Sequence, residues 1–139
     1  MVKVLDMKLI RYANLFNKIT RIRTNHCFLY NNTIVFAVPR SFVVKAIGRD
    51  NSNLKTLNQM IGKKIKIVAI PDGKEDIEKF VSVIVYPVKF KSIDIRDSEA
   101  VINASSQSKA SLIGRGKIRL TEMQGILEQY FGIKKLRVR

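Results

Sequence analysis

Residues 46–49 read Ala-Ile-Gly-Arg, and residues 112–115 read Leu-Ile-Gly-Arg. In both places a short run with helical spacing ends at the glycine, and a second helical run begins a few residues later. Glycine commonly ends a helix because it adopts positive φ angles without steric cost. The sequence therefore predicts two helix–glycine–turn–helix motifs, 66 residues apart.

The similarity between the two halves continues beyond this motif. The same spacing of 66 residues pairs Leu54 with Leu120 and Leu57 with Met123. The strand-like runs that follow, Lys-Lys-Ile-Lys-Ile at 63–67 and Lys-Lys-Leu-Arg-Val at 134–138, are 71 residues apart, so the second copy has gained five residues in between. An internal duplication accounts for this order, and it predicts two domains of one fold.

Hydrophobic periodicity and turn residues give each copy the element order αββααβ. Asn31-Asn32 predicts a hairpin turn, and Ser41 is placed to cap the short helix before Gly48. Leu54, Leu57, Met60 and Ile61 form the apolar stripe of the next helix, which Gly62 ends. In the first copy we expect helices over 6–20, 42–47 and from Ser52 to 61, with strands over 26–30, 33–38 and 63–70.

The second copy begins after a turn at Pro71-Asp72-Gly73. Its predicted elements are a helix over 74–86, strands over 88–96 and 100–104, helices over 108–113 and 118–131, and a strand over 134–138. The fold class is therefore α+β, with a three-stranded sheet packed against helices in each copy.

The charge balance points to a polyanionic partner. The 139 residues hold 26 Lys and Arg against 11 Asp and Glu, a formal net charge of +15. RNA, DNA and an anionic membrane are the candidates, but no apolar run of about 18 residues exists to span a bilayer. Charged residues interrupt the N-terminal stretch, so we expect no signal peptide and a cytoplasmic protein.

The residue types of catalytic and metal sites are scarce. Cys27 and His26 are the only residues of their kinds, and both are expected to be structural. There is no paired-carboxylate arrangement and no Walker-type motif. We therefore expect no enzymatic activity, no cofactor, no metal site and no small-molecule substrate. The aromatic side chains are expected to serve the core: Phe80, Tyr86, Phe90, Tyr130 and Phe131.

A helix that ends in glycine, a basic turn and a second helix can bind phosphate. Backbone N–H groups, positive side chains and the dipole of the second helix converge at one place. The adjacent helix and strand then form a groove for bases. The predicted phosphate contacts are Gly48, Arg49, Asn51, Gly114, Arg115, Gly116 and Lys117. The predicted groove-lining residues are Lys45, Ile47, Ser111 and Ile113.

This arrangement resembles the type II KH domain, whose GxxG loop holds about four nucleotides of a single strand. Two such domains, 1–71 and 72–139, are similar to the short archaeal relative of the transcription factor NusA. The resemblance rests on residues 47–49, 57–65, 113–116 and 130–133. It implies binding of single-stranded RNA in transcription elongation, termination or antitermination, with RNA polymerase as a further candidate partner.

The sequence departs from the GxxG pattern at the last position, which is Asn51 in one turn and Lys117 in the other. Asn enters the left-handed region readily, whereas Lys117 predicts a different turn conformation or a shortened register. An alternative therefore stays open, namely a protein-interaction module on the transcription or translation machinery. The sequence does not decide between DNA and RNA.

Overall fold

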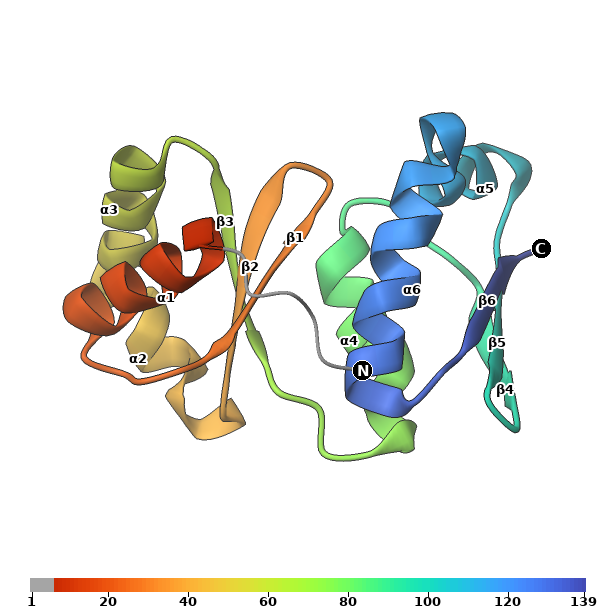
Figure 1. The fold of residues 1–139 in the computed structure, drawn as a ribbon, viewed down its shortest axis with the longest axis horizontal. Helices are drawn as coiled ribbons and strands as arrows, with labels where there is room; N and C mark the ends of the chain where they lie inside the picture. Colours follow the sequence, from red (N-terminus) through yellow and green to blue (C-terminus); the bar gives the residue numbers. More distant parts are fainter. Residues whose placement is uncertain (1–6) are drawn as a thin grey trace. The chain divides into compact units, whose positions relative to one another are not determined.

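The computed structural model describes residues 7–139, which form two compact units. One unit ends at Ile70 and the other runs from Pro71 to Arg139. The predicted start of the first helix at Asp6 lies outside the described residues. Each unit has the element order αββααβ, interrupted only by short 3₁₀ turns (Figure 1).

In the first unit, helix α1 (Met7–Thr20) precedes a hairpin of β1 (His26–Tyr30) and β2 (Thr33–Val38). Two helices follow, α2 (Val43–Ile47) and α3 (Ser52–Ile61), and then strand β3 (Lys64–Ala69). The second unit repeats the series as α4 (Ile77–Val85), β4 (Ser92–Arg96), β5 (Glu99–Asn103), α5 (Ser106–Ile113), α6 (Ile118–Phe131) and β6 (Lys135–Val138).

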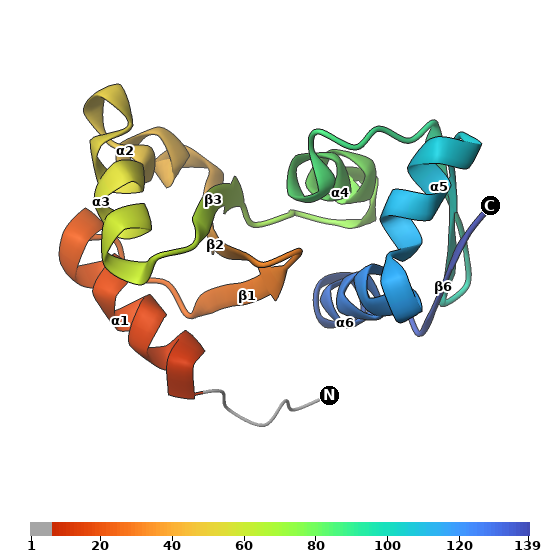
Figure 2. The ribbon, with the colours of Figure 1, turned by 90° about the horizontal axis from the view of Figure 1, so that it is seen from above.

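The two sheets have the same topology. In each one the middle strand pairs antiparallel with the strand before it and parallel with the strand that follows the helix pair. Within each unit the helices lie on one face of the sheet, as both views show (Figures 1 and 2). The last strand of each unit, β3 or β6, is therefore an edge strand beside the helices.

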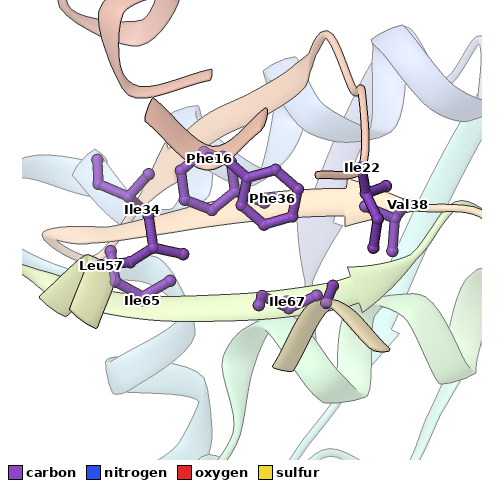
Figure 3. Close-up of a cluster of buried hydrophobic side chains, with 9 residues drawn as sticks. Phe16, Ile22, Ile34, Phe36, Val38, Leu57, Ile65 and Ile67 are labelled. Carbon is purple, nitrogen blue, oxygen red and sulfur yellow. The ribbon is translucent and has the colours of Figure 1, made fainter. Parts of the chain in front are cut away.

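Helix α1 closes the core of the first unit. Phe16 is fully buried and stacks on Phe36 of β2 with a distance of 4.4 Å between ring centroids. Leu57 of α3 reaches the same cluster between the strands (Figure 3). The other buried members of this cluster are Ile22, Ile34, Val38, Ala46, Ile65 and Ile67.

The predicted apolar stripe of α3 includes one residue that is buried and one that is exposed. These two residues form a matched pair for testing the packing of the helix. Leu57 is 0% exposed, whereas Met60 is 61% exposed, so the stripe is narrower than predicted. We expect Leu57→Ala to lower the free energy of unfolding by about 2–5 kcal/mol because it leaves a cavity. Met60→Ala should change it by less than about 0.5 kcal/mol. Urea titrations of both variants test this, and equal effects would contradict the packing described for α3.

Three further predictions about the helices, the strands and the core were wrong. The strand predicted over 88–96 begins only at Ser92, because its partner strand ends at Asn103 and pairing stops there. Ser41 does not cap α2; a 3₁₀ turn over Arg40–Phe42 precedes the helix instead, with the Phe42 N–H donating to the Pro39 carbonyl at 2.8 Å. Tyr86 is 69% exposed, since it follows the last turn of α4.

Candidate nucleic-acid interface

The turns between α2 and α3 and between α5 and α6 follow the same backbone path. Gly48 has φ 84° and ψ 167°, and Gly114 has φ 77° and ψ 170°. Two residues after the glycine, each turn has two consecutive residues in the left-handed region. They are Asp50 and Asn51 in one turn and Gly116 and Lys117 in the other. The duplicated sequence thus gives a duplicated turn.

The first glycine of each turn is required for two reasons. Its φ and ψ lie in a region that only glycine occupies readily. A Cβ on Gly48 would lie 2.7 Å from the Ser52 Oγ and 2.9 Å from the Asn53 backbone nitrogen, and a Cβ on Gly114 would lie 3.0 Å from the Arg119 backbone nitrogen. The glycine therefore lets the turn approach the first turn of the following helix.

The last position of the turn does not behave as predicted for the second copy. Lys117 has φ 62° and ψ 23°, close to the values of 62° and 27° at Asn51, and the register is unchanged. The same hydrogen bond closes both turns: the Lys117 N–H donates to the Gly114 carbonyl at 3.1 Å, and the Asn51 N–H donates to the Gly48 carbonyl at 3.2 Å. Lysine thus adopts the left-handed conformation at a cost of about 1–2 kcal/mol.

Each turn presents its charged side chains to solvent. Arg49 and Asn51 are exposed in the first unit, and Arg115, Gly116 and Lys117 are exposed in the second, while Gly48 and Gly114 are half-buried. Of the predicted groove-lining residues, Lys45 and Ser111 are exposed, and Ile47 and Ile113 are half-buried. Each unit thus brings its own predicted set together at the helix–turn–helix.

Arg119, which follows the second turn, is already paired. Its Nη1 donates to the Glu122 carboxylate at 2.7 Å, and both side chains are about one-fifth exposed. Its aliphatic stem lies against Gly114, where an added Cβ would be 2.7 Å from the Arg119 Cγ. Arg119 supports the turn and adds little net charge to it. The positive charge of the second turn comes from Arg115 and Lys117.

Sequence reasoning missed a groove of about 290 Å³ in the first unit. Its walls come from the first turns of α3 and from the edge strand β3. The groove is apolar at Leu54 and Ile65 and basic at its rim, and its full lining is Thr33, Leu54, Lys55, Asn58, Lys64, Ile65 and Lys66. It begins just after the Gly48 turn, because Leu54 and Lys55 belong to the start of α3.

Burial at this groove affects one of its lysines, Lys66. The pKa of Lys66 lies below its usual range, first because the side chain is partly buried and second because Lys64 repels a second positive charge. The alternation of lysine with isoleucine at 63–67 was a signal for this groove. This alternation predicts a groove only if β3 is known to be an edge strand beside α3, and the sequence does not give that position.

The described part of the chain contains no helix with the length and hydropathy of a membrane span. Two α+β units, each with a three-stranded sheet and a glycine turn between two helices, are consistent with a KH-like fold.

Comparisons with known proteins agree with this class. No protein-family model matches the chain. It is 27% identical over 127 residues to the "Probable transcription termination protein NusA" of Methanocaldococcus jannaschii, covering 88% of this chain and 68% of the relative. It is 23% identical over 133 residues to the protein of the same name from Methanococcus vannielii, covering 93% and 75%.

A solved structure, the crystal structure of APE1850, is 28% identical to the chain. It superimposes with a TM-score of 0.65 over 97% of this chain and 100% of that one. The chain is thus similar to archaeal NusA-like proteins over most of its length, which confirms the resemblance indicated by the repeated Ile-Gly-Arg turns.

Proposed function

We propose that the chain is a NusA-type transcription factor that binds single-stranded RNA through two tandem type II KH domains, 1–71 and 72–139. The main support is the shared backbone path of the two glycine turns, together with the named relatives. The RNA is nascent transcript, and the process is termination, antitermination or elongation. RNA polymerase is the proposed protein partner, and the site of action is the cytoplasm.

The proposed mechanism is binding without catalysis. The turn holds backbone phosphates with its N–H groups and with Arg49, or with Arg115 and Lys117. The N-terminus of α3 or α6 adds its dipole to the same place. In the first unit the groove beside β3 then accepts bases, since its floor is apolar and its rim carries polar groups for their edges.

The salt dependence of binding tests this function. A single strand that loses Z phosphate charges shows a slope of log K against log[salt] of about −0.7Z. One turn that holds about four nucleotides should give a slope near −3, and both turns together a steeper one. Fluorescence anisotropy with a labelled single-stranded RNA measures it. The absence of binding at about 50 mM salt would rule out the RNA-binding function.

The second candidate is a protein-interaction module on the transcription or translation machinery. It is favoured by one observation, the replacement of the last glycine by Asn51 and Lys117 in both turns. A pull-down from nuclease-treated extract that recovers polymerase or ribosomal subunits, together with no RNA binding by the purified chain, would support it.

A further inference from the structure

The two units carry very different charge. Residues 7–70 contain twelve Lys and Arg but a single carboxylate, Asp50. Residues 71–139 contain thirteen Lys and Arg and nine carboxylates. The cations of the first unit cannot be neutralised within that unit, whatever their arrangement. Such self-repulsion destabilises a compact unit and favours a polyanionic partner.

Five of these cations lie on α1 and on the connection that follows it, Lys8 and four further residues. Arg11 and Lys18 are exposed and seven residues apart, so they lie on one face of the helix. Arg21 and Arg23 are exposed in the connection to β1. We call these four residues the α1 basic surface. No acidic residue occurs between 7 and 49 in the sequence.

The backbone that carries Arg21 and Arg23 is held in place by buried neighbours. Thr20, Ile22 and Thr24 alternate with the two arginines and are buried. The Thr24 hydroxyl donates to the Ala37 carbonyl at 2.6 Å, and the Thr24 N–H donates to the Asn17 Oδ1 at 2.9 Å. The two arginines therefore emerge from a fixed segment, which lowers the entropy lost on binding a ligand.

Stabilisation of the α1 C-terminus explains only part of this surface. A cation in the last turn of a helix complements its dipole, and Lys18 serves that purpose. Arg11 lies mid-helix and Arg23 lies beyond the helix. Arg21 has φ 62°, a conformation in which glycine or asparagine is the more stable choice. An arginine at a strained, exposed position points to a binding role.

The α1 basic surface is not suited to a bilayer. A helix that binds a membrane surface needs its apolar face free. Here Phe16 of α1 is fully buried against Phe36, so the apolar face of α1 is occupied by the core. Met7 and Ile10, in the first turn of α1, are its exposed large apolar side chains. The remaining chemistry is a row of cations, which fits a phosphodiester backbone.

This surface is separate from the glycine turn of the same unit. In Figure 2 the turn between α2 and α3 lies at the top of the first unit, and α1 runs from the level of α3 down to the bottom of the unit. A segment of about four nucleotides held at the turn would leave the α1 basic surface unoccupied.

We propose that Arg11, Lys18, Arg21 and Arg23 bind the phosphate backbone of single-stranded RNA outside the segment that the turns hold. This inference rests on the proposed RNA-binding function. It adds a second contact that requires a longer RNA and carries no base specificity.

The test compares two RNA lengths and two variants of the full chain. One variant combines Arg11→Gln, Lys18→Gln, Arg21→Gly and Arg23→Gln. The matched control removes four exposed lysines of the second unit as Lys89→Gln, Lys91→Gln, Lys134→Gln and Lys135→Gln. Both lower the net charge by the same amount. Anisotropy is measured with RNAs of about 5 and about 20 nucleotides over a salt series, with circular dichroism as the check on folding.

For the longer RNA, the first variant should bind at least about tenfold more weakly at low salt, with a slope that is about 2–3 smaller in magnitude. The control should lose much less, and both should bind the short RNA nearly as the unchanged chain does. Equal losses in both variants overturn the α1 surface but leave the turns as binding sites. Retained RNA binding with loss of binding to anionic phospholipid vesicles would assign the surface to a membrane instead.

If the unchanged chain binds neither the short nor the long RNA, the proposed function and this inference are both overturned. If the fourfold variant does not fold, Lys18→Gln with Arg23→Gln replaces it. Two lost contacts should still lower the slope by about 1.4.

Discussion

Arg115→Asp combined with Lys117→Asp should weaken the binding of a short single-stranded RNA by about a hundredfold, because two charge-assisted phosphate contacts are replaced by repulsion. Arg49→Asp should weaken it by about tenfold or less. The first turn holds Arg49 beside Asp50, so its formal charge is zero, whereas the second turn carries two positive charges. Since both turns have the same backbone path, charge rather than geometry should decide between them.

Two further variants separate the contributions. Arg115→Asp alone matches Arg49→Asp in its charge change. Lys117→Gly removes one charge and relieves the left-handed strain, so it should raise stability slightly while weakening binding by less than tenfold. Anisotropy with an RNA of about five nucleotides measures all four. A larger loss from Arg49→Asp than from Arg115→Asp would show that the first turn, with Asn51 at its last position, is the stronger site.

Gly48→Ala and Gly114→Ala should each lower the free energy of unfolding by about 2–3 kcal/mol. The added methyl group would force the turn out of its glycine-only conformation and away from the following helix, where the Asn53 or Arg119 backbone nitrogen lies within 3.0 Å of the new Cβ. Denaturant titration with circular dichroism detects the loss. RNA binding by each variant should fall as well, because the N–H groups of the turn would be displaced.

Gly116→Ala is the control for this pair. It has φ 62° but open space around the position of a Cβ, so only the cost of the left-handed conformation applies, about 1 kcal/mol. If Gly114→Ala proved no more costly than Gly116→Ala, the close approach of the turn to α6 would not be a determinant of stability.

Much of the fold could be predicted because its signals are local. The strands His26–Tyr30 and Thr33–Val38 and the helix Ile118–Phe131 were predicted with the bounds that the structure has. Glycines 62 and 132 end α3 and α6, and the end of α3 at Gly62 was predicted; both glycines are left-handed. In these segments the spacing of the apolar residues and the residues that end the element predict the same bounds.

The predictions that failed depend on partners far away in sequence. Val88 and Phe90 alternate with lysines as strand residues do, although out of phase with Ile93 and Ile95 of β4. A strand exists only where a neighbour pairs with it, and β5 ends at Asn103, opposite Ser92. The groove beside β3 likewise depends on which strand lies at the edge of the sheet. The excess of positive charge that includes the α1 basic surface could be found from the sequence, since a count of Lys and Arg against Asp and Glu in each half shows it.

The conformation of Lys117 shows the limit of a residue-by-residue comparison with a motif. Lysine is unfavourable at a left-handed position, so the sequence predicted a changed turn. The surrounding helices and the Gly114 carbonyl impose the conformation instead. A local preference of about 1–2 kcal/mol is overridden when the two flanking helices are fixed by the core.

The difference in length between α3 and α6 limits how the two copies could have diverged. Helix α3 has 10 residues and α6 has 14, so four of the five additional residues lengthen the helix and the fifth lies before β6. Four residues rotate a helix by about 400°, so the end of α6 faces within about 40° of its former direction. An insertion of two residues would turn Phe131 away from the core. Variants of this helix that still fold should therefore differ in length by three, four or seven residues, because only such insertions keep the end of the helix facing the core. The pitch of the helix thus restricts which insertions the coding sequence could accept.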